Sequence, residues 1–147
     1  MARQMSPAEI RSFMRGGSRT GMLATVRENG APHVVPIWFD FDDETGEAVF
    51  VAGSHSIKAR NMARDPRVSI AVDVSEMPFA FARLDGLATL STYEDDPAAM
   101  LHWATETCRR YVGDDLAEQY GRRNAVPEER LVRVNPTRMT GATGIAD

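Results

Sequence analysis

Cysteine is almost absent from this sequence, since Cys108 is the only one among 147 residues. A single thiol excludes an internal disulfide and any metal site built from several cysteines. Histidine is also scarce, and the three histidines lack the spacing of metal ligands, so we expect no bound metal. A chain without disulfides fits a reducing compartment, and we expect a cytoplasmic protein.

Long apolar runs and excess positive charge are lacking as well. No stretch approaches the roughly 18 apolar residues of a membrane span, and residues 1–7 contain no apolar core of a signal peptide. The net charge is −4, whereas proteins that bind nucleic acid or anionic membranes present a basic face. We therefore expect no membrane and no nucleic-acid partner. The length fits one domain, residues 1–147.

Short apolar segments separated by turn residues make up most of the chain. Hairpin signals at Asn29-Gly30 and at residues 42–46 join the first three segments, and both residues of the first pair tolerate positive φ. This order predicts a mainly-β fold, a small antiparallel barrel with peripheral helices. The expected strands are residues 20–27, 32–41, 47–52, 68–74, 79–92 and 131–139. The expected helices are residues 6–15, a short one around 57–64, 95–111 and 114–123.

Two residues inside expected strands predict irregular pairing. Pro36 interrupts the apolar segment 32–41, and proline cannot donate to a strand ladder. It therefore requires a sheet edge, a bulge or a place where a ligand replaces the neighbouring strand. Gly86 lies in the middle of the segment 79–92 and predicts a kink or bulge there.

The most informative segment is a strand, a polar turn and a short helix that ends at Asp65-Pro66. A helix N-terminus presents unpaired N–H groups and a partial positive charge, which attract anions. Lys58, Arg60 and Asn61 stand in the first turns of this helix, so we predict that they hold a phosphate. Two serines precede them and either bind the same phosphate or cap the helix. These are Ser54 and Ser56.

Four segments share their pattern with a known family. They are Gly21–Val26, Asn29–Phe39, Lys58–Val68 and Leu84–Ala88. On these segments the chain resembles the pyridoxamine 5′-phosphate oxidase-like split β-barrel family. It is most similar to the branch that uses the deazaflavin coenzyme F420, because vitamin B6 oxidases carry a basic, leucine-rich segment where this chain has the neutral Val35–Trp38.

The resemblance implies an F420-dependent oxidoreductase that transfers hydride between reduced deazaflavin and an activated double bond of a small organic substrate. It also implies a homodimer with the cofactor in the groove between subunits. Pro36, Ile37 and Trp38 would then line the cofactor ring, or they pack in the core. The residues identify no catalytic group, which suits chemistry that the cofactor supplies.

Two alternatives remain open at this point. The first is an FMN-dependent enzyme on the same barrel, either a pyridoxamine 5′-phosphate oxidase-like oxidase or a flavin reductase. The second is a non-catalytic protein that binds a flavin or haem, for which His33, on an apolar strand, is the candidate axial ligand. Cys108 is expected to be inert, because no histidine or asparagine partner is indicated nearby.

Overall fold

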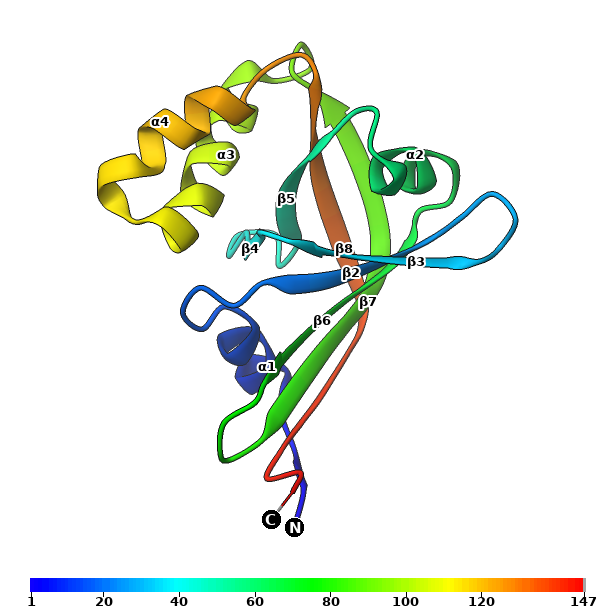
Figure 1. Cartoon of the computed structure of the whole chain (residues 1–147), viewed down its shortest axis with the longest axis vertical. Coiled ribbons are helices and arrows are strands. Elements are labelled where there is room, and N and C mark those ends of the chain that lie inside the picture. The colour runs from blue at the N-terminus through cyan, green and yellow to red at the C-terminus, as the bar shows by residue number, and fades with distance from the viewer. Residues whose placement is uncertain (147) are drawn as a thin grey trace.

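The computed structural model describes residues 1–146 and consists mainly of one curled antiparallel sheet with helices at its edges (Figure 1). The strands are β1 (Arg3–Gln4), β2 (Gly21–Val26), β3 (Pro32–Ile37), β4 (Asp40–Phe41), β5 (Ala48–Gly53), β6 (Arg67–Val74), β7 (Ala80–Thr92) and β8 (Glu129–Thr143). The helices are α1 (Pro7–Met14), α2 (Ile57–Arg64), α3 (Pro97–Val112) and α4 (Asp114–Asn124).

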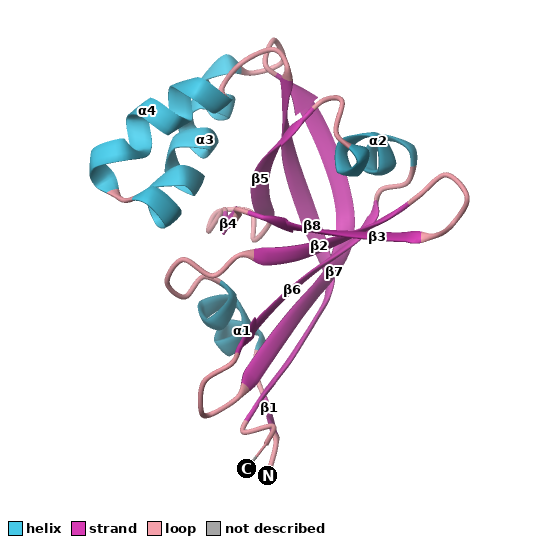
Figure 2. Cartoon of the chain, in the orientation of Figure 1, coloured by secondary structure: helices cyan, strands magenta, loops and turns pink. Residues whose placement is uncertain are grey.

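The main strands follow the order β3-β2-β6-β7-β8-β5-β4, and β1 pairs with β8. The sheet curls into half of a barrel, with α2 beside it and the α3–α4 pair at one end (Figure 2). The prediction of a mainly-β fold with peripheral helices is therefore confirmed. None of the helices within residues 1–146 has the length and apolar character needed to cross a membrane.

Local sequence signals fixed several element ends. The Ser6 hydroxyl accepts from Glu9 N–H while the Glu9 carboxylate accepts from Ser6 N–H, a reciprocal cap that starts α1. The predicted hairpin at Asn29-Gly30 joins β2 to β3, but only Gly30 takes a positive φ, of 85°. The predicted hairpin is therefore present, but the left-handed conformation is confined to the glycine.

The predicted strand 32–41 is divided in the structure, because residues 38 and 39 lie between β3 and β4. Phe39 N–H donates to the Tyr111 hydroxyl at 3.2 Å, and Phe39 O accepts from the Arg110 guanidinium at 2.5 Å. Side chains of α3 thus take the backbone groups that a continuous strand would pair. Pro36 lies in β3, an outer strand of the sheet, which is one of the settings that its missing N–H requires.

The expected irregularity at Gly86 is confirmed by a register shift between Asp85 and Gly86 in the pairing of β7 with β8. A Cβ atom on Gly86 would lie 2.5 Å from the backbone oxygen of Asn135, so only glycine fits this close approach. The final strand is longer than the predicted 131–139, because β8 continues along β7 to Thr143.

The main core fills the inside of the curled sheet. Leu23, Phe50, Ile70 and Leu84 are fully buried there and come from four different strands. A second, small cluster of Val49, Met100 and Leu131 holds α3 against β5 and β8. These contacts fix the α3–α4 pair beside the C-terminal end of β3, where the candidate site lies.

Candidate functional site

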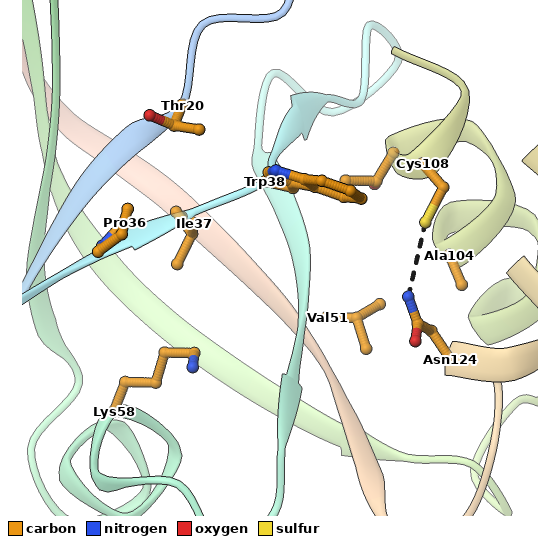
Figure 3. A pocket seen from close by; sticks show the side chains of 10 residues that line it. Thr20, Pro36, Ile37, Trp38, Val51, Lys58, Ala104, Cys108 and Asn124 are labelled. Atoms are coloured by element: carbon orange, nitrogen blue, oxygen red, sulfur yellow. Dashed lines mark hydrogen bonds between the residues drawn. The ribbon is translucent and has the colours of Figure 1, made fainter. Parts of the chain in front are cut away.

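A cavity of about 400 Å³ lies where β3, β5, α2, α3 and α4 meet (Figure 3). Four of the residues predicted to bind a cofactor line it: Pro36, Ile37, Trp38 and Lys58. The other lining residues are Thr20, Val51, Ala104, Thr107, Cys108 and Asn124. Segments more than 80 residues apart in the sequence therefore form one concave site, of the size that small-molecule pockets commonly have.

The apolar wall of the cavity is the end of β3 and the residue that follows it. Ile37 is buried, whereas Trp38 keeps 39% of its surface exposed and is stacked on Tyr111, with ring centroids 4.9 Å apart and planes 5° from parallel. Because the Tyr111 ring covers one face of the Trp38 ring, the other face of Trp38 can stack on a flat ligand.

Two neighbouring side chains of α3 hold this wall in place. The Arg110 guanidinium donates to the backbone oxygens of Met14, Gly17, Arg19 and Phe39 at 2.5–3.2 Å. The Tyr111 hydroxyl donates to Arg19 O at 2.8 Å. Burial raises the pKa of Tyr111, so its phenol stays protonated at neutral pH and remains a donor.

Lys58 extends from the first turn of α2 toward Pro36 and Ile37 (Figure 3). It is the only charged residue of the cavity lining, and within residues 1–146 no carboxylate oxygen lies within 4 Å of its ammonium group. Burial raises the pKa of Glu129, and the positive charge of Lys58 opposes that rise. Lys58 thus brings a positive charge, which forms no ion pair within residues 1–146, to one end of the cavity.

The other residues predicted for the phosphate site lie outside the cavity lining. Ser56 caps α2, because its hydroxyl accepts from Ala59 N–H at 3.2 Å and donates to Gly53 O at 2.7 Å. Arg60 is exposed, and Ser54 lies at the end of β5 with its N–H bonded to Glu128 O.

Asn61 is buried, at 5% exposure, and its amide donates to the Thr25 hydroxyl at 3.0 Å. This hydrogen bond joins α2 to β2. The structure brings Lys58 and the β3 wall together and gives Ser56 and Asn61 structural partners. A phosphate contact from any of the four residues outside the lining stays a prediction; they are Ser54, Ser56, Arg60 and Asn61.

The opposite end of the cavity consists of helix residues that the sequence did not reveal. Thr107 and Cys108 come from α3, and Asn124 ends α4 and donates from its amide to the Cys108 sulfur at 3.5 Å (Figure 3). The spacing of Ala104, Thr107 and Cys108 places them on one helix face. That spacing was a usable signal, whereas nothing in the sequence indicated that Asn124 would meet them.

His33, the candidate haem ligand, is not part of the cavity lining. It lies on β3 opposite Thr25, and its Nδ1 atom is buried without a hydrogen-bond partner among the described residues. Residues 1–146 contain no group of three histidine, cysteine or acidic side chains arranged to hold a metal ion.

Comparison with known proteins identifies the family. The model of the pyridoxamine 5′-phosphate oxidase family matches residues 6–141. The chain belongs to this family. Its members bind flavin-type cofactors, and the curled sheet of this chain is their split β-barrel.

Among solved structures, the conserved hypothetical protein Rv2991 from Mycobacterium tuberculosis superimposes with a TM-score of 0.80 and 28% identity. That superposition covers 96% of this chain and 86% of the other. An F420 reductase superimposes with a TM-score of 0.69 and 24% identity, over 87% of this chain and 94% of the other. The similarity to the F420 reductase shows that the two proteins share a fold.

A curated relative is the 5a,11a-dehydrotetracycline/5a,11a-dehydrooxytetracycline reductase of Streptomyces rimosus. It is 43% identical over 56 residues, which are 36% of this chain and 39% of that protein. The match thus spans well under half of the relative. The family match agrees with the resemblance predicted from the sequence motifs.

Proposed function

We propose that this protein is an F420-dependent oxidoreductase, which transfers a hydride from reduced deazaflavin to an activated double bond of a small organic substrate. The observation that carries the proposal is Lys58, a cation without an ion pair among residues 1–146, at one end of a cavity whose apolar wall is Pro36, Ile37 and Trp38. A ligand with a flat ring and a phosphate suits these two features. The reductase relative and the F420 reductase neighbour agree with this assignment.

The hydrogen-bond donors at the cavity suit the phosphate of such a cofactor. Lys58 and the first N–H groups of α2 would bind the phosphate, since a helix start and a nearby ammonium group both attract anions. Trp38 and Ile37 would contact the ring and keep water from it. The deazaflavin, when bound, supplies hydride chemistry, and the chain's own residues bind and orient it.

FMN is the second candidate cofactor, and one observation favours it. F420 continues beyond its phosphate into an anionic tail, whereas FMN ends at the phosphate. Lys58 is the one cation among the cavity's lining residues, and Arg60 lies on the exposed side of α2. A single chain therefore offers few positive charges along the cavity for an extended tail.

We further propose that the protein is a homodimer, with the cofactor between subunits. Met22, Val34, Phe81 and Leu87 are each 40–56% exposed and share one face of the sheet by their register. Pro36 belongs to this face and also lines the cavity, so a second copy seated there would reach the cavity mouth. A monomer in sedimentation experiments at micromolar concentration would refute the dimer.

The test is a fluorescence titration of cofactor-free protein with F420 and with FMN. We expect micromolar or tighter binding of F420 and much weaker binding of FMN. Lys58→Ala should weaken F420 binding by about 1.5–3 kcal/mol, the range for hydrogen bonds to charged groups. Arg122→Ala is the matched control, because it removes one positive charge from an exposed part of α4 outside the cavity.

Each other outcome has a defined meaning. Preference for FMN would replace the deazaflavin by the FMN-dependent alternative. Unchanged affinity in Lys58→Ala would remove the phosphate assignment at this residue, and an effect in Arg60→Ala alone would move the phosphate to the exposed side of α2. Tight binding without turnover of any acceptor would favour a storage protein, and haem would be the next ligand to test.

A further inference from the structure

A carboxylate, that of Glu129, lies beside the helix start that carries Lys58. Glu129 begins β8 and pairs with Gly53, the last residue of β5. A Cβ atom on Gly53 would lie 3.9 Å and 4.0 Å from the two carboxylate oxygens of Glu129, so the carboxylate lies against this glycine. The backbone oxygen of Gly53 accepts from the hydroxyl of Ser56, which caps α2. The Glu129 carboxylate therefore lies at the turn that leads into α2.

The charges of Glu129 and Lys58 act on each other without direct contact. Glu129 is half-buried, and among residues 1–146 no lysine, arginine or histidine nitrogen lies within 4 Å of its carboxylate. Burial raises the pKa of Glu129, the positive charge of Lys58 opposes that rise, and the neighbouring Glu128 adds to it. Lys58 is therefore the cation whose field reaches Glu129, and the carboxylate acts equally on what Lys58 binds.

An anion held by Lys58 meets both charges. Lys58 attracts each negative charge of the ligand and Glu129 repels it, so the carboxylate cancels much of the attraction that a second negative charge would gain. Removing a doubly charged group from water also costs more than removing a singly charged one. A phosphate monoester carries about 1.5 to 2 negative charges at pH 7, whereas a phosphodiester carries one. The two side chains together therefore favour the diester.

We propose that Glu129 is a specificity-determining residue, which makes the anion site at Lys58 select a singly charged phosphodiester over a doubly charged phosphate monoester. This selectivity rests on the phosphate contact of Lys58 in the proposed function. The phosphate of F420 is a diester, because the tail continues from it, and the phosphate of FMN is a monoester. Both cofactors have a flat ring that suits the cavity wall, so Glu129 distinguishes them where the wall does not.

The test uses three flavins that share one ring and differ in charge at the end of the ribityl chain. Riboflavin is neutral, its 5′-methylphosphate diester carries one negative charge, and FMN carries about two at pH 8. Dissociation constants are measured at pH 8 by quenching of flavin fluorescence, on wild-type protein and on Glu129→Gln, which removes the charge and keeps the size. Glu128→Gln is the matched control, because it removes a carboxylate from the exposed neighbouring residue.

We expect the effect of Glu129→Gln to grow with the charge of the ligand. The affinity for riboflavin should change less than about twofold, whereas the methylphosphate should bind about threefold and FMN about tenfold more tightly, as expected for one charge pair at a partly exposed site. In the wild-type protein the diester should bind at least as tightly as FMN. Glu128→Gln should leave all three affinities nearly unchanged. A role of Glu129 in packing alone would not depend on the charge of the ligand.

Four results would overturn the selectivity. They are an equal change for all three flavins in Glu129→Gln, no change for any of them, tighter binding of FMN than of the diester to wild-type protein, and no binding of either phosphorylated flavin. Titration of the wild-type protein with F420 separates this proposal from the cofactor assignment. Failure of F420 to bind, with the dependence on ligand charge intact, would refute the cofactor and leave the role of Glu129 standing.

Discussion

Replacing Arg110 by methionine is expected to destabilise the protein far more than the same change at its neighbour Arg109. The Arg110 guanidinium is the common donor to four backbone oxygens that belong to the α1–β2 connection and to the β3–β4 break. It also lies over the rings of Phe39 and Tyr111, at 4.9 Å and 5.0 Å from their centroids. Methionine keeps a similar apolar length but donates no hydrogen bond.

The size of the effect follows from the acceptors that lose their donor. Three of the four hydrogen bonds are partly buried, and the one to Gly17 O is exposed. An acceptor left unsatisfied in a buried position costs about 1–3 kcal/mol. The Tyr111 hydroxyl contacts both Arg19 O and Phe39 O and can still donate to one of them, so two partly buried oxygens lose their donor. Taking the lower value for each gives about 2 kcal/mol for Arg110→Met. In a chain of this size that corresponds to a fall in Tm of roughly 4–8 °C.

The assay is thermal unfolding followed by circular dichroism, with two comparison variants. Arg109 forms ion pairs with Glu106 at 3.3 Å and Asp114 at 2.9 Å, and its side chain is 37% exposed. Exposed ion pairs contribute about 0–1 kcal/mol, so Arg109→Met should lower Tm by only a few degrees. Arg110→Lys retains the charge but not the planar fork, and it should fall between wild type and Arg110→Met.

Equal Tm values for Arg110→Met and Arg109→Met would refute this reasoning, because they would show that the four backbone oxygens gain nothing from the guanidinium. An Arg110→Lys variant as stable as wild type would show that the planar guanidinium fork is not needed, because an ammonium group also donates hydrogen bonds.

Two further predictions concern ionisable groups. Because burial raises the pKa of Cys108, its thiol should react with a disulfide reagent at pH 8 at least about tenfold more slowly in the folded protein than in the unfolded chain; equal rates would contradict the buried position. The Arg3 guanidinium and the Ser6 N–H lower the pKa of Glu9 to about 2, below the value of about 4.3 in an unfolded chain. A lowered carboxyl pKa stabilises the fold above pH 5 and stops doing so as the pH falls toward 2, so Glu9→Gln should lower Tm at pH 6 but not at pH 2. A loss of Tm that is the same at both pH values would assign the effect to packing.

Local interactions made a large part of the fold predictable. The Ser6–Glu9 cap, the glycine of the β2–β3 hairpin and the end of α2 before Pro66 all depend on residues within a few positions of one another. The bulge at Gly86 was also predictable, because a glycine inside an apolar strand commonly marks a bulge or the close approach of another backbone. The family could be recognised from the sequence because its motifs are local runs of this kind.

The candidate site was predicted in part. The sequence identified Lys58 and the wall at Pro36, Ile37 and Trp38, because a charge that opens a helix and a proline that breaks a strand are visible locally. It also grouped Asn61 with them, and the structure shows that this amide is bonded to Thr25. The spacing of residues along a helix predicts which of them share a face of the helix. It does not predict which residues elsewhere in the chain that face contacts.

The sequence by itself determined where helices begin, where hairpins turn and that a short helix with Lys58 in its first turn follows a buried strand. Only the tertiary structure decided that Arg110 and Tyr111 hold Phe39, some 70 residues away, and that Thr107 and Asn124 close the cavity opposite Lys58. The reason is physical. Caps and turns depend on hydrogen bonds between near neighbours, whereas these contacts exist only after the packing of α3 and α4 against the curled sheet has brought distant backbone and side-chain groups together.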